Sequence, residues 1–274
     1  MRNPLIGQTV LITGGGSGIG RLMALGAADR GARVLVWDLD DDAARAVRDQ
    51  IRARGGQAEA ARVDVSDRAA VAEAAAAASD VDVLINNAGV VTGKKLLDAT
   101  DEQIARTFNV NVLPLYWMTR AFLPGMLARG HGTVVTIASA AGLVGVAKQT
   151  DYSASKFAAF GFAESLRAEL KKDRTGVTSL VVCPYYISTG MFEGVRTKFP
   201  RLLPILEPEY VARRVLDAVE EGREQLILPP FVRTMPLVRA LPTRAFDAVV
   251  TFFGVNDTMD HFVGRAGNKD NARV

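Results

Sequence analysis

The chain is poor in the residues that build disulfides and metal centres. Its 274 residues include one cysteine, Cys183, and two histidines, His131 and His261. A single cysteine excludes an internal disulfide and is typical of a reducing compartment, where we expect Cys183 to pack as a small core residue. Because the two histidines are far apart and have no cysteine or carboxylate cluster beside them, we expect no metal site.

The sequence also has no strong charge of one sign and no long hydrophobic segment. A net charge of +3 arises from 33 basic and 30 acidic residues that alternate along the chain, so the charge does not favour a nucleic-acid partner. The first residues lead directly into an apolar run at Thr9, which leaves no room for a signal peptide or a membrane-spanning helix. These absences predict a cytoplasmic protein without a membrane span.

The chain does contain enough apolar residues for a full core, since 49% of it is hydrophobic. Short apolar runs alternate with helical stretches, which predicts an α/β protein with a parallel sheet and helices on both faces. We expect a single-domain, doubly wound Rossmann fold with about seven strands and a C-terminal helical extension. The expected strands are Thr9 to Thr13, Ala32 to Trp37, Ala60 to Val65, Val81 to Asn86, Thr133 to Ala138, Val177 to Cys183 and Gln225 to Leu228.

A glycine-rich turn follows the first expected strand. Gly14, Gly18 and Gly20 lie between Thr13 and a helical pattern that begins at Arg21. Strand, glycine turn and helix form a phosphate-binding arrangement, because glycines admit a pyrophosphate and the helix N-terminus offers free N–H groups. The spacing is TGxxxGxG rather than GxGxxG, and no Gly-Lys-Ser/Thr follows, which disfavours a nucleoside-triphosphate P-loop. A merely flexible turn would not need the strand and helix on either side.

The second expected strand ends at Asp38, about 20 residues beyond the last glycine of the turn, where a carboxylate is expected to bind the adenosine ribose. That charge would repel a 2′-phosphate, and neither Leu39 nor Ser17 supplies a compensating base. The pattern therefore favours NAD over NADP. The acidic residues after Leu39 are expected to cap the next helix, and Arg21 to lie on a helix surface, although it could reach a 2′-phosphate.

Tyr152 and Lys156 are four residues apart, so a helix would place them on one face. A free tyrosine titrates near pH ~10, and a neighbouring ammonium would lower the phenol pKa and suit it to general acid–base catalysis. Ser139 follows an apolar strand, where ligands of open α/β sheets gather. By itself, such a pair is more often a packed tyrosine beside a solvated lysine.

Together these motifs resemble the classical short-chain dehydrogenases/reductases over roughly residues 5–228. The resemblance implies hydride transfer at a nicotinamide, with catalytic residues Ser139, Tyr152, Lys156 and Asn111. Asn111 would hold a proton-relay water; the alternatives are a helix amide bonded to backbone, or neighbouring Asn109 in that role. The cofactor-binding residues that the resemblance implies are Gly14, Ser17, Gly18, Ile19, Gly20, Asp38, Asp64, Val65, Asn87, Ala88, Gly89, Tyr152, Lys156, Pro184, Ile187 and Thr189.

One position departs from the family pattern. Tyr185 stands after Pro184 where the family usually has glycine, which adds bulk beside the expected nicotinamide site. The stretch from Cys183 to Phe192 looks most like the branch containing retinol and lipid-associated hydroxysteroid dehydrogenases. That branch implies a small apolar alcohol or ketone as substrate, and family members of this type form homodimers or homotetramers.

The expected domain, residues 1–228, carries a lid at about 188–210 that is apolar and interrupted by prolines; ordinary core packing is the alternative. The extension, residues 229–274, mixes phenylalanines with arginines. Such a stretch can pack on the same domain, on a partner subunit or on a membrane surface. Its aspartates weaken the membrane alternative, so we expect subunit or lid packing.

The sequence thus predicts an NAD-dependent oxidoreductase that interconverts a hydrophobic secondary or allylic alcohol, steroid-, retinoid- or lipid-like, and its carbonyl. Tyr152 would move the proton, Ser139 would bind the substrate oxygen, and Lys156 would hold the nicotinamide ribose. Two alternatives remain. One is an NADPH-dependent acyl-chain ketoreductase, which Asp38 disfavours; the other is a non-catalytic dinucleotide sensor or scaffold, which has no use for an activated phenol.

Overall fold

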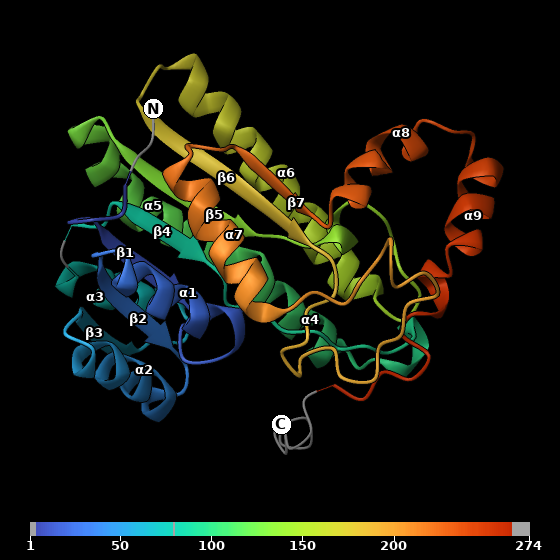
Figure 1. Cartoon of the computed structure of the whole chain (residues 1–274), viewed down its shortest axis with the longest axis horizontal. Helices are drawn as coiled ribbons and strands as arrows, with labels where there is room; N and C mark the ends of the chain where they lie inside the picture. Colours follow the sequence, from blue (N-terminus) through green and yellow to red (C-terminus); the bar gives the residue numbers. More distant parts are fainter. Residues whose placement is uncertain (1–3, 79, 265–274) are drawn as a thin grey trace.

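A seven-stranded parallel sheet forms the centre of the computed structural model, which describes residues 4–78 and 80–264 (Figure 1). The strand order is β3-β2-β1-β4-β5-β6-β7, so the order reverses between β1 and β4. Ligands of such sheets bind beyond the carboxyl ends of the strands at this reversal. The strands are β1 (Thr9–Thr13), β2 (Arg33–Asp38), β3 (Gln57–Arg62), β4 (Val83–Asn86), β5 (Gly132–Ile137), β6 (Val177–Pro184) and β7 (Gln225–Leu228).

Helices pack on both faces of the sheet, as expected for a doubly wound fold. The helices are α1 (Gly18–Asp29), α2 (Asp41–Ala53), α3 (Arg68–Ala77), α4 (Asp101–Asn111), α5 (Leu113–Arg129), α6 (Thr150–Lys172), α7 (Pro208–Glu220), α8 (Met235–Arg239) and α9 (Thr243–Phe252), with short 3-10 turns η1 (Leu96–Asp98), η2 (Ala140–Gly142), η3 (Pro230–Thr234) and η4 (Val255–Asp257). Helix α1 contacts both α2 and α7, and α3 to α6 form a second connected set.

Alternation along the strands explains the two layers. On β1, Val10 and Ile12 join the core beneath α1 and α7, whereas Leu11 joins the core that includes Phe122 of α5 and Leu166 of α6. Successive side chains of a strand point to opposite faces, so a strand covered on both sides is apolar at every position. This double burial produced the continuous apolar runs that predicted the central strands.

The edge strand β3 differs from its prediction. It spans Gln57–Arg62 rather than residues 60–65, because as an edge strand it is only partly buried and carries polar residues that hid its start. Asp64 and Val65 therefore lie in the loop after the strand. Two smaller expectations are confirmed: the Asp40 carboxylate caps α2 by accepting from the Ala43 N–H at 3.0 Å, and Cys183 is fully buried.

The chain after β6 and the C-terminal extension pack against each other beyond the carboxyl ends of the strands (Figure 1). The Arg196 N–H donates to the Thr258 carbonyl at 3.2 Å, and the Phe199 ring stacks on Phe252 with centroids 5.5 Å apart. The extension was predicted as residues 229–274, of which 265–274 lie outside the described residues. Within the described part of the chain, no helix is both long and apolar enough to cross a membrane. The division into domain and extension stays a prediction.

Candidate active site

The turn between β1 and α1 depends on its glycines. Gly14 and Gly18 have φ angles of 63° and 53°, in the region that favours glycine. A Cβ on Gly20 would lie 2.1 Å from the Gly14 carbonyl oxygen and 2.6 Å from the Asn87 Nδ2 atom. The first turn of α1 therefore contacts the end of β1 directly, and the helix N–H groups face the carboxyl edge of the sheet.

Thr13 and Asn87 hold β1 and β4 together at this edge. The Asn87 and Ala88 N–H groups donate to Thr13 Oγ1 at 3.0 and 3.1 Å, and Asn87 Nδ2 donates to the carbonyls of Thr13 and Gly14 at 2.9 and 3.2 Å. The Asn87 side chain thereby fixes the glycine turn, and the residue also lines the cleft. Its predicted role in binding the cofactor stays a prediction.

A Gly20→Ala substitution is expected to weaken cofactor binding and to destabilise the fold by about 1 to 3 kcal/mol, because the new methyl overlaps backbone atoms. Gly161→Ala is the matched control: a Cβ there meets no atom within 4 Å, and alanine stabilises a helix interior by about 0.5 to 1 kcal/mol relative to glycine. Thermal unfolding and titration with NAD measure both effects. Equal behaviour of the two variants would contradict the close approach at Gly20.

The Asp38 carboxylate is oriented at the end of β2. Its Oδ2 atom accepts from the Gly16 N–H at 2.8 Å and its Oδ1 atom from the Asp40 N–H at 3.0 Å. Both bonds come from backbone, so the charge sits at a fixed place beside the glycine turn. Arg21, in contrast, donates to the Gln50 side chain at 2.8 Å, which matches the expected helix-surface position.

The loop after β3 carries the next pair of predicted residues. Asp64 accepts from the N–H and Oγ of Ser66 at 2.8 and 2.6 Å, and the Val65 carbonyl accepts from Trp117 Nε1 of α5 at 2.8 Å. The loop is thereby fixed across the cleft from α1. It forms the wall where the sequence resemblance expects the adenine.

Ser139, Tyr152 and Lys156 meet beyond the ends of β5 and β6. Tyr152 and Lys156 lie on the first turns of α6 and are each 5% exposed. Lys156 Nζ lies 5.6 Å from the centre of the Tyr152 ring and donates to the Ile137 carbonyl at 2.9 Å. Ser139 Oγ accepts from the Ala141 N–H at 3.1 Å and donates to the Pro184 carbonyl at 3.5 Å.

Burial dominates the electrostatics of this group. Loss of water raises the pKa of the Tyr152 phenol above its ordinary value, although the Ser139 hydrogen bond opposes that rise. Burial also lowers the pKa of Lys156 to about 8. The prediction that Lys156 lowers the pKa of Tyr152 is therefore wrong for the net direction, because desolvation of the phenol outweighs the other effects. At neutral pH the phenol is protonated and can donate.

Asn111 is the last residue of α4 and is buried. Its Oδ1 atom accepts from the Val90 N–H at 2.8 Å, and its Nδ2 atom donates to the Val90 carbonyl at 2.9 Å and to Ser155 Oγ at 3.0 Å. These bonds tie the loop after β4 to α6 one residue from Lys156. These contacts fit the alternative in which Asn111 is a helix amide bonded to backbone.

The chain after β6 forms the wall opposite Asp64. Pro184, Ile187 and Thr189 line the cleft, as does Tyr185. Tyr185 is half-buried, its N–H donates to the Leu228 carbonyl at 2.8 Å, and its ring packs edge-on against Tyr186 with centroids 4.7 Å apart. The bulky residue at the usual glycine position is thus accommodated by turning its ring toward the second cavity described below.

Every residue predicted to bind the cofactor lines one cleft at the carboxyl edge of the sheet, of about 1850 Å³ counting its opening to solvent. The cleft joins a helix N-terminus at the glycine turn, the Asp38 carboxylate and the Lys156 ammonium. These groups suit a pyrophosphate, a ribose diol and a second ribose, respectively. The residues present therefore fit a nicotinamide dinucleotide, although the role of each residue stays a prediction.

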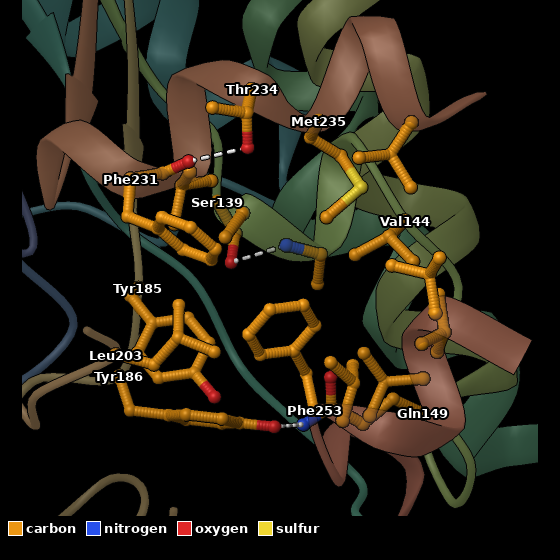
Figure 2. Close-up of a pocket in the computed structure, with 18 of the residues that line it drawn as sticks. Ser139, Val144, Gln149, Tyr185, Tyr186, Leu203, Phe231, Thr234, Met235 and Phe253 are labelled. Carbon is orange, nitrogen blue, oxygen red and sulfur yellow. Dashed lines mark hydrogen bonds between the residues drawn. The ribbon is translucent and has the colours of Figure 1, made fainter. Parts of the chain in front are cut away.

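A second cavity, of about 780 Å³ counting its opening to solvent, adjoins the cleft (Figure 2). The two share Ser139, Tyr152, Tyr185 and Phe192. The walls of the second cavity come from the chain after β5, the chain after β6, and the C-terminal extension. Nearly all of the lining is hydrophobic, which suits an apolar ligand. The apolar lining includes Val144, Val146, Phe192, Leu203, Phe231, Val232, Met235, Val238, Val249, Val250, Phe253 and Val255.

Sequence reasoning missed part of this cavity. Gln149 and Tyr186 line it, and Tyr186 bonds to Thr258 of the extension. Gln149 stands three residues before Tyr152, a spacing that would have placed it on the same helix face. The contribution of α8 and α9 had no comparable signal, because the contacts join residues about one hundred positions apart.

Comparisons with known proteins agree with this geometry. The family model described as short chain dehydrogenase matches residues 8–199. The chain is 42% identical to epidermal retinol dehydrogenase 2 of Mus musculus over 275 residues, covering 96% of this chain and 88% of that protein. Two solved structures are also similar. One is a short chain dehydrogenase/reductase from Burkholderia phymatum in complex with NAD, with a TM-score of 0.78, 28% identity and coverage of 87% and 95%. The other is a putative NAD(P) dependent gluconate 5-dehydrogenase from Beutenbergia cavernae with bound NADP, with a TM-score of 0.71, 32% identity and coverage of 82% and 96%.

Proposed function

The chain belongs to the short-chain dehydrogenase family and is an NAD(P)-binding oxidoreductase, and we propose that it interconverts hydrophobic secondary or allylic alcohols and their carbonyls with NAD. The observation that carries the substrate class is the apolar cavity that adjoins Ser139 and Tyr152. The similarity to a retinol dehydrogenase supports the same class. Steroid-, retinoid- and lipid-like alcohols all fit this description.

The protein residues orient the reactants and move one proton. Ser139 Oγ and the Tyr152 phenol lie in both the cleft and the cavity, so a substrate oxygen that reaches them from the cavity faces the cofactor cleft. During reduction the Tyr152 phenol donates its proton to the substrate oxygen; during oxidation the phenol first releases its proton to solvent, and the tyrosinate then accepts the hydroxyl proton. Ser139 donates a hydrogen bond to the oxygen where charge develops. The nicotinamide supplies the hydride chemistry when bound.

Lys156 holds the positive charge that a tyrosinate requires. Because the pKa of Tyr152 is raised by burial, deprotonating the phenol without a nearby cation would be costly. With a pKa of about 8, Lys156 is largely protonated at neutral pH. The contacts of Asn111 favour a positioning role, since they fix the loop beside Lys156. Its water-holding role stays a prediction.

Removing the Lys156 charge is expected to stabilise the fold while impairing activity. The pKa of Lys156 is about 8 in the folded protein, below the ordinary value of 10.5 that applies to the unfolded chain. Burying the charged ammonium therefore lowers the free energy of unfolding. This destabilisation is fully present below pH 8 and absent above pH 10.5. At ~1.4 kcal/mol per pKa unit, the destabilisation is on the order of 3 kcal/mol.

The test compares thermal or urea unfolding of Lys156→Met with the parent protein across that pH range. We expect the variant to be the more stable at pH 7, with a difference that shrinks as the pH rises from about 8 to 10.5. A parent that is more stable than the variant at neutral pH would contradict the desolvation of Lys156.

NAD is proposed over NADP because a carboxylate at the end of the second strand is expected to accept from the adenosine ribose and to repel a 2′-phosphate, and backbone hydrogen bonds hold the Asp38 carboxylate beside the glycine turn. Homodimers or homotetramers are proposed through the helices around Asn111 and Tyr152, and the half-exposed Leu113 and Tyr116 of α5 support such a contact. A cytoplasmic location is likewise retained as a proposal, and peripheral membrane contact of the extension as its alternative.

A further inference from the structure

The apolar cavity is lined by one side-chain amide, Gln149, besides the hydroxyl-bearing residues Ser139, Tyr152, Tyr185, Tyr186 and Thr234. Ser139 and Tyr152 serve the reacting oxygen, and Thr234 Oγ1 already donates to the Phe231 carbonyl at 2.8 Å. Gln149 remains. Its side chain lines the cavity, and the residue is 1% exposed.

A directional chain of hydrogen bonds fixes the Gln149 amide. Thr258 Oγ1 donates to the Val255 carbonyl at 2.8 Å, so its single proton is used. The Tyr186 hydroxyl, 2.9 Å from Thr258 Oγ1, therefore donates to it and must accept at its other side. The Gln149 Nε2 group, 3.4 Å from the Tyr186 hydroxyl, supplies that proton.

This orientation leaves Gln149 Oε1 as a buried, unmet acceptor on a side chain that lines the cavity. Among the residues that the structure describes, no side chain or backbone group donates to it. Buried polar atoms are nearly always hydrogen-bonded, because an unmet acceptor keeps the full cost of losing water. In a cavity with mostly apolar walls, a ligand hydroxyl would meet that need.

The position of Gln149 relative to the reacting groups indicates where that hydroxyl lies on the ligand. Gln149 directly precedes α6 and stands one turn before Tyr152. Figure 2 shows Ser139 near the top of the cavity and the Gln149–Tyr186 pair at the bottom, with Phe253 between them. A ligand whose reacting oxygen lies at Ser139 would extend past apolar side chains before reaching the amide.

We propose that the substrate carries a second hydroxyl, apart from the one that is oxidised, and that this hydroxyl donates a hydrogen bond to Gln149 Oε1. The inference rests on the proposed function and narrows it, from apolar alcohols in general to diols with a hydrophobic skeleton between the two hydroxyls. Gln149 would then select among apolar alcohols without taking part in proton transfer.

The test uses pairs of compounds, each a hydrophobic secondary alcohol and the matching diol, on steroid and linear alkyl skeletons with increasing separation between the hydroxyls. Binding to the NAD-saturated protein is measured by calorimetry. For the pairs with a fitting separation, we expect the diol to bind about tenfold more tightly than the alcohol, the effect of one neutral hydrogen bond.

Gln149→Met and Gln149→Leu should each bring the ratio of diol to alcohol affinity close to one. Two variants are used so that a folding defect in one of them does not decide the result. Thr234→Val is the matched control, since its hydroxyl is already bonded to backbone, and it should keep the diol preference. Equal binding of alcohol and diol for every pair, or a preference that survives in both Gln149 variants, overturns the inference. A water molecule that serves Gln149 would give the first of these results.

Turnover of the same compounds separates this inference from the proposed function. If alcohols and diols are oxidised with NAD at similar rates and bind equally, the second-hydroxyl site is contradicted, whereas the alcohol dehydrogenase activity is supported. If a diol binds tightly and in a Gln149-dependent way but no NAD is reduced, the dehydrogenase activity is contradicted, whereas the binding site is supported.

Discussion

Replacing Tyr152 with phenylalanine is expected to lower turnover of an alcohol substrate by about 10²- to 10⁴-fold, the range typical of a lost general acid–base group. Phenylalanine keeps the ring that packs edge-on against Phe192, with centroids 5.7 Å apart, so the wall of the cavity is retained. NAD affinity should change little, because the phenol acts on the substrate oxygen. Steady-state kinetics and cofactor titration measure the two effects separately.

Tyr210→Phe is the matched control for that experiment. Tyr210 lies on α7, packs against Arg213 and lines neither the cleft nor the cavity. Its phenylalanine variant should retain the parent rate. A Tyr152→Phe enzyme with near-normal turnover would assign proton transfer to another group.

Replacing Asp38 should narrow or invert the preference for NAD over NADP, by about 1 to 3 kcal/mol if the lost repulsion resembles a charged hydrogen bond. Asp38→Asn separates charge from geometry, since the amide oxygen can still accept from the Gly16 N–H. Asp38→Arg adds a partner for the 2′-phosphate and is expected to invert the preference. Dissociation constants of both cofactors measure the change.

Asp40→Asn removes a charge two residues away, at the cap of α2. It should leave the ratio of the two dissociation constants unchanged, which shows that the effect belongs to Asp38 rather than to general charge. Equal affinities of the parent protein for NAD and NADP would contradict the assignment.

Local patterns predicted the fold and most of the cleft. Fully buried strands such as β4 and β5 appear as largely apolar runs. The glycine turn marks the start of α1, because a Cβ at position 20 would overlap the Gly14 carbonyl. The partly polar edge strand β3 gave a weaker pattern, and its predicted start was three residues late.

The properties that the sequence did not predict depend on contacts between distant segments. The pKa of Tyr152 rises because several elements enclose it, an effect that spacing along α6 could not show. The Gln149–Tyr186–Thr258 chain joins the residue before α6, the segment after β6 and the extension. A polar network of this kind becomes visible only when tertiary packing brings its members together.

The central claim is tested most directly by supplying hydrophobic secondary and allylic alcohols with either cofactor and following the absorbance of the reduced nicotinamide. The account predicts reduction of NAD with apolar alcohols, a much smaller rate with NADP, and little reaction with polar polyols of similar size. Absence of NAD reduction across the apolar panel, or a reaction confined to NADP and acyl-chain substrates, would contradict it.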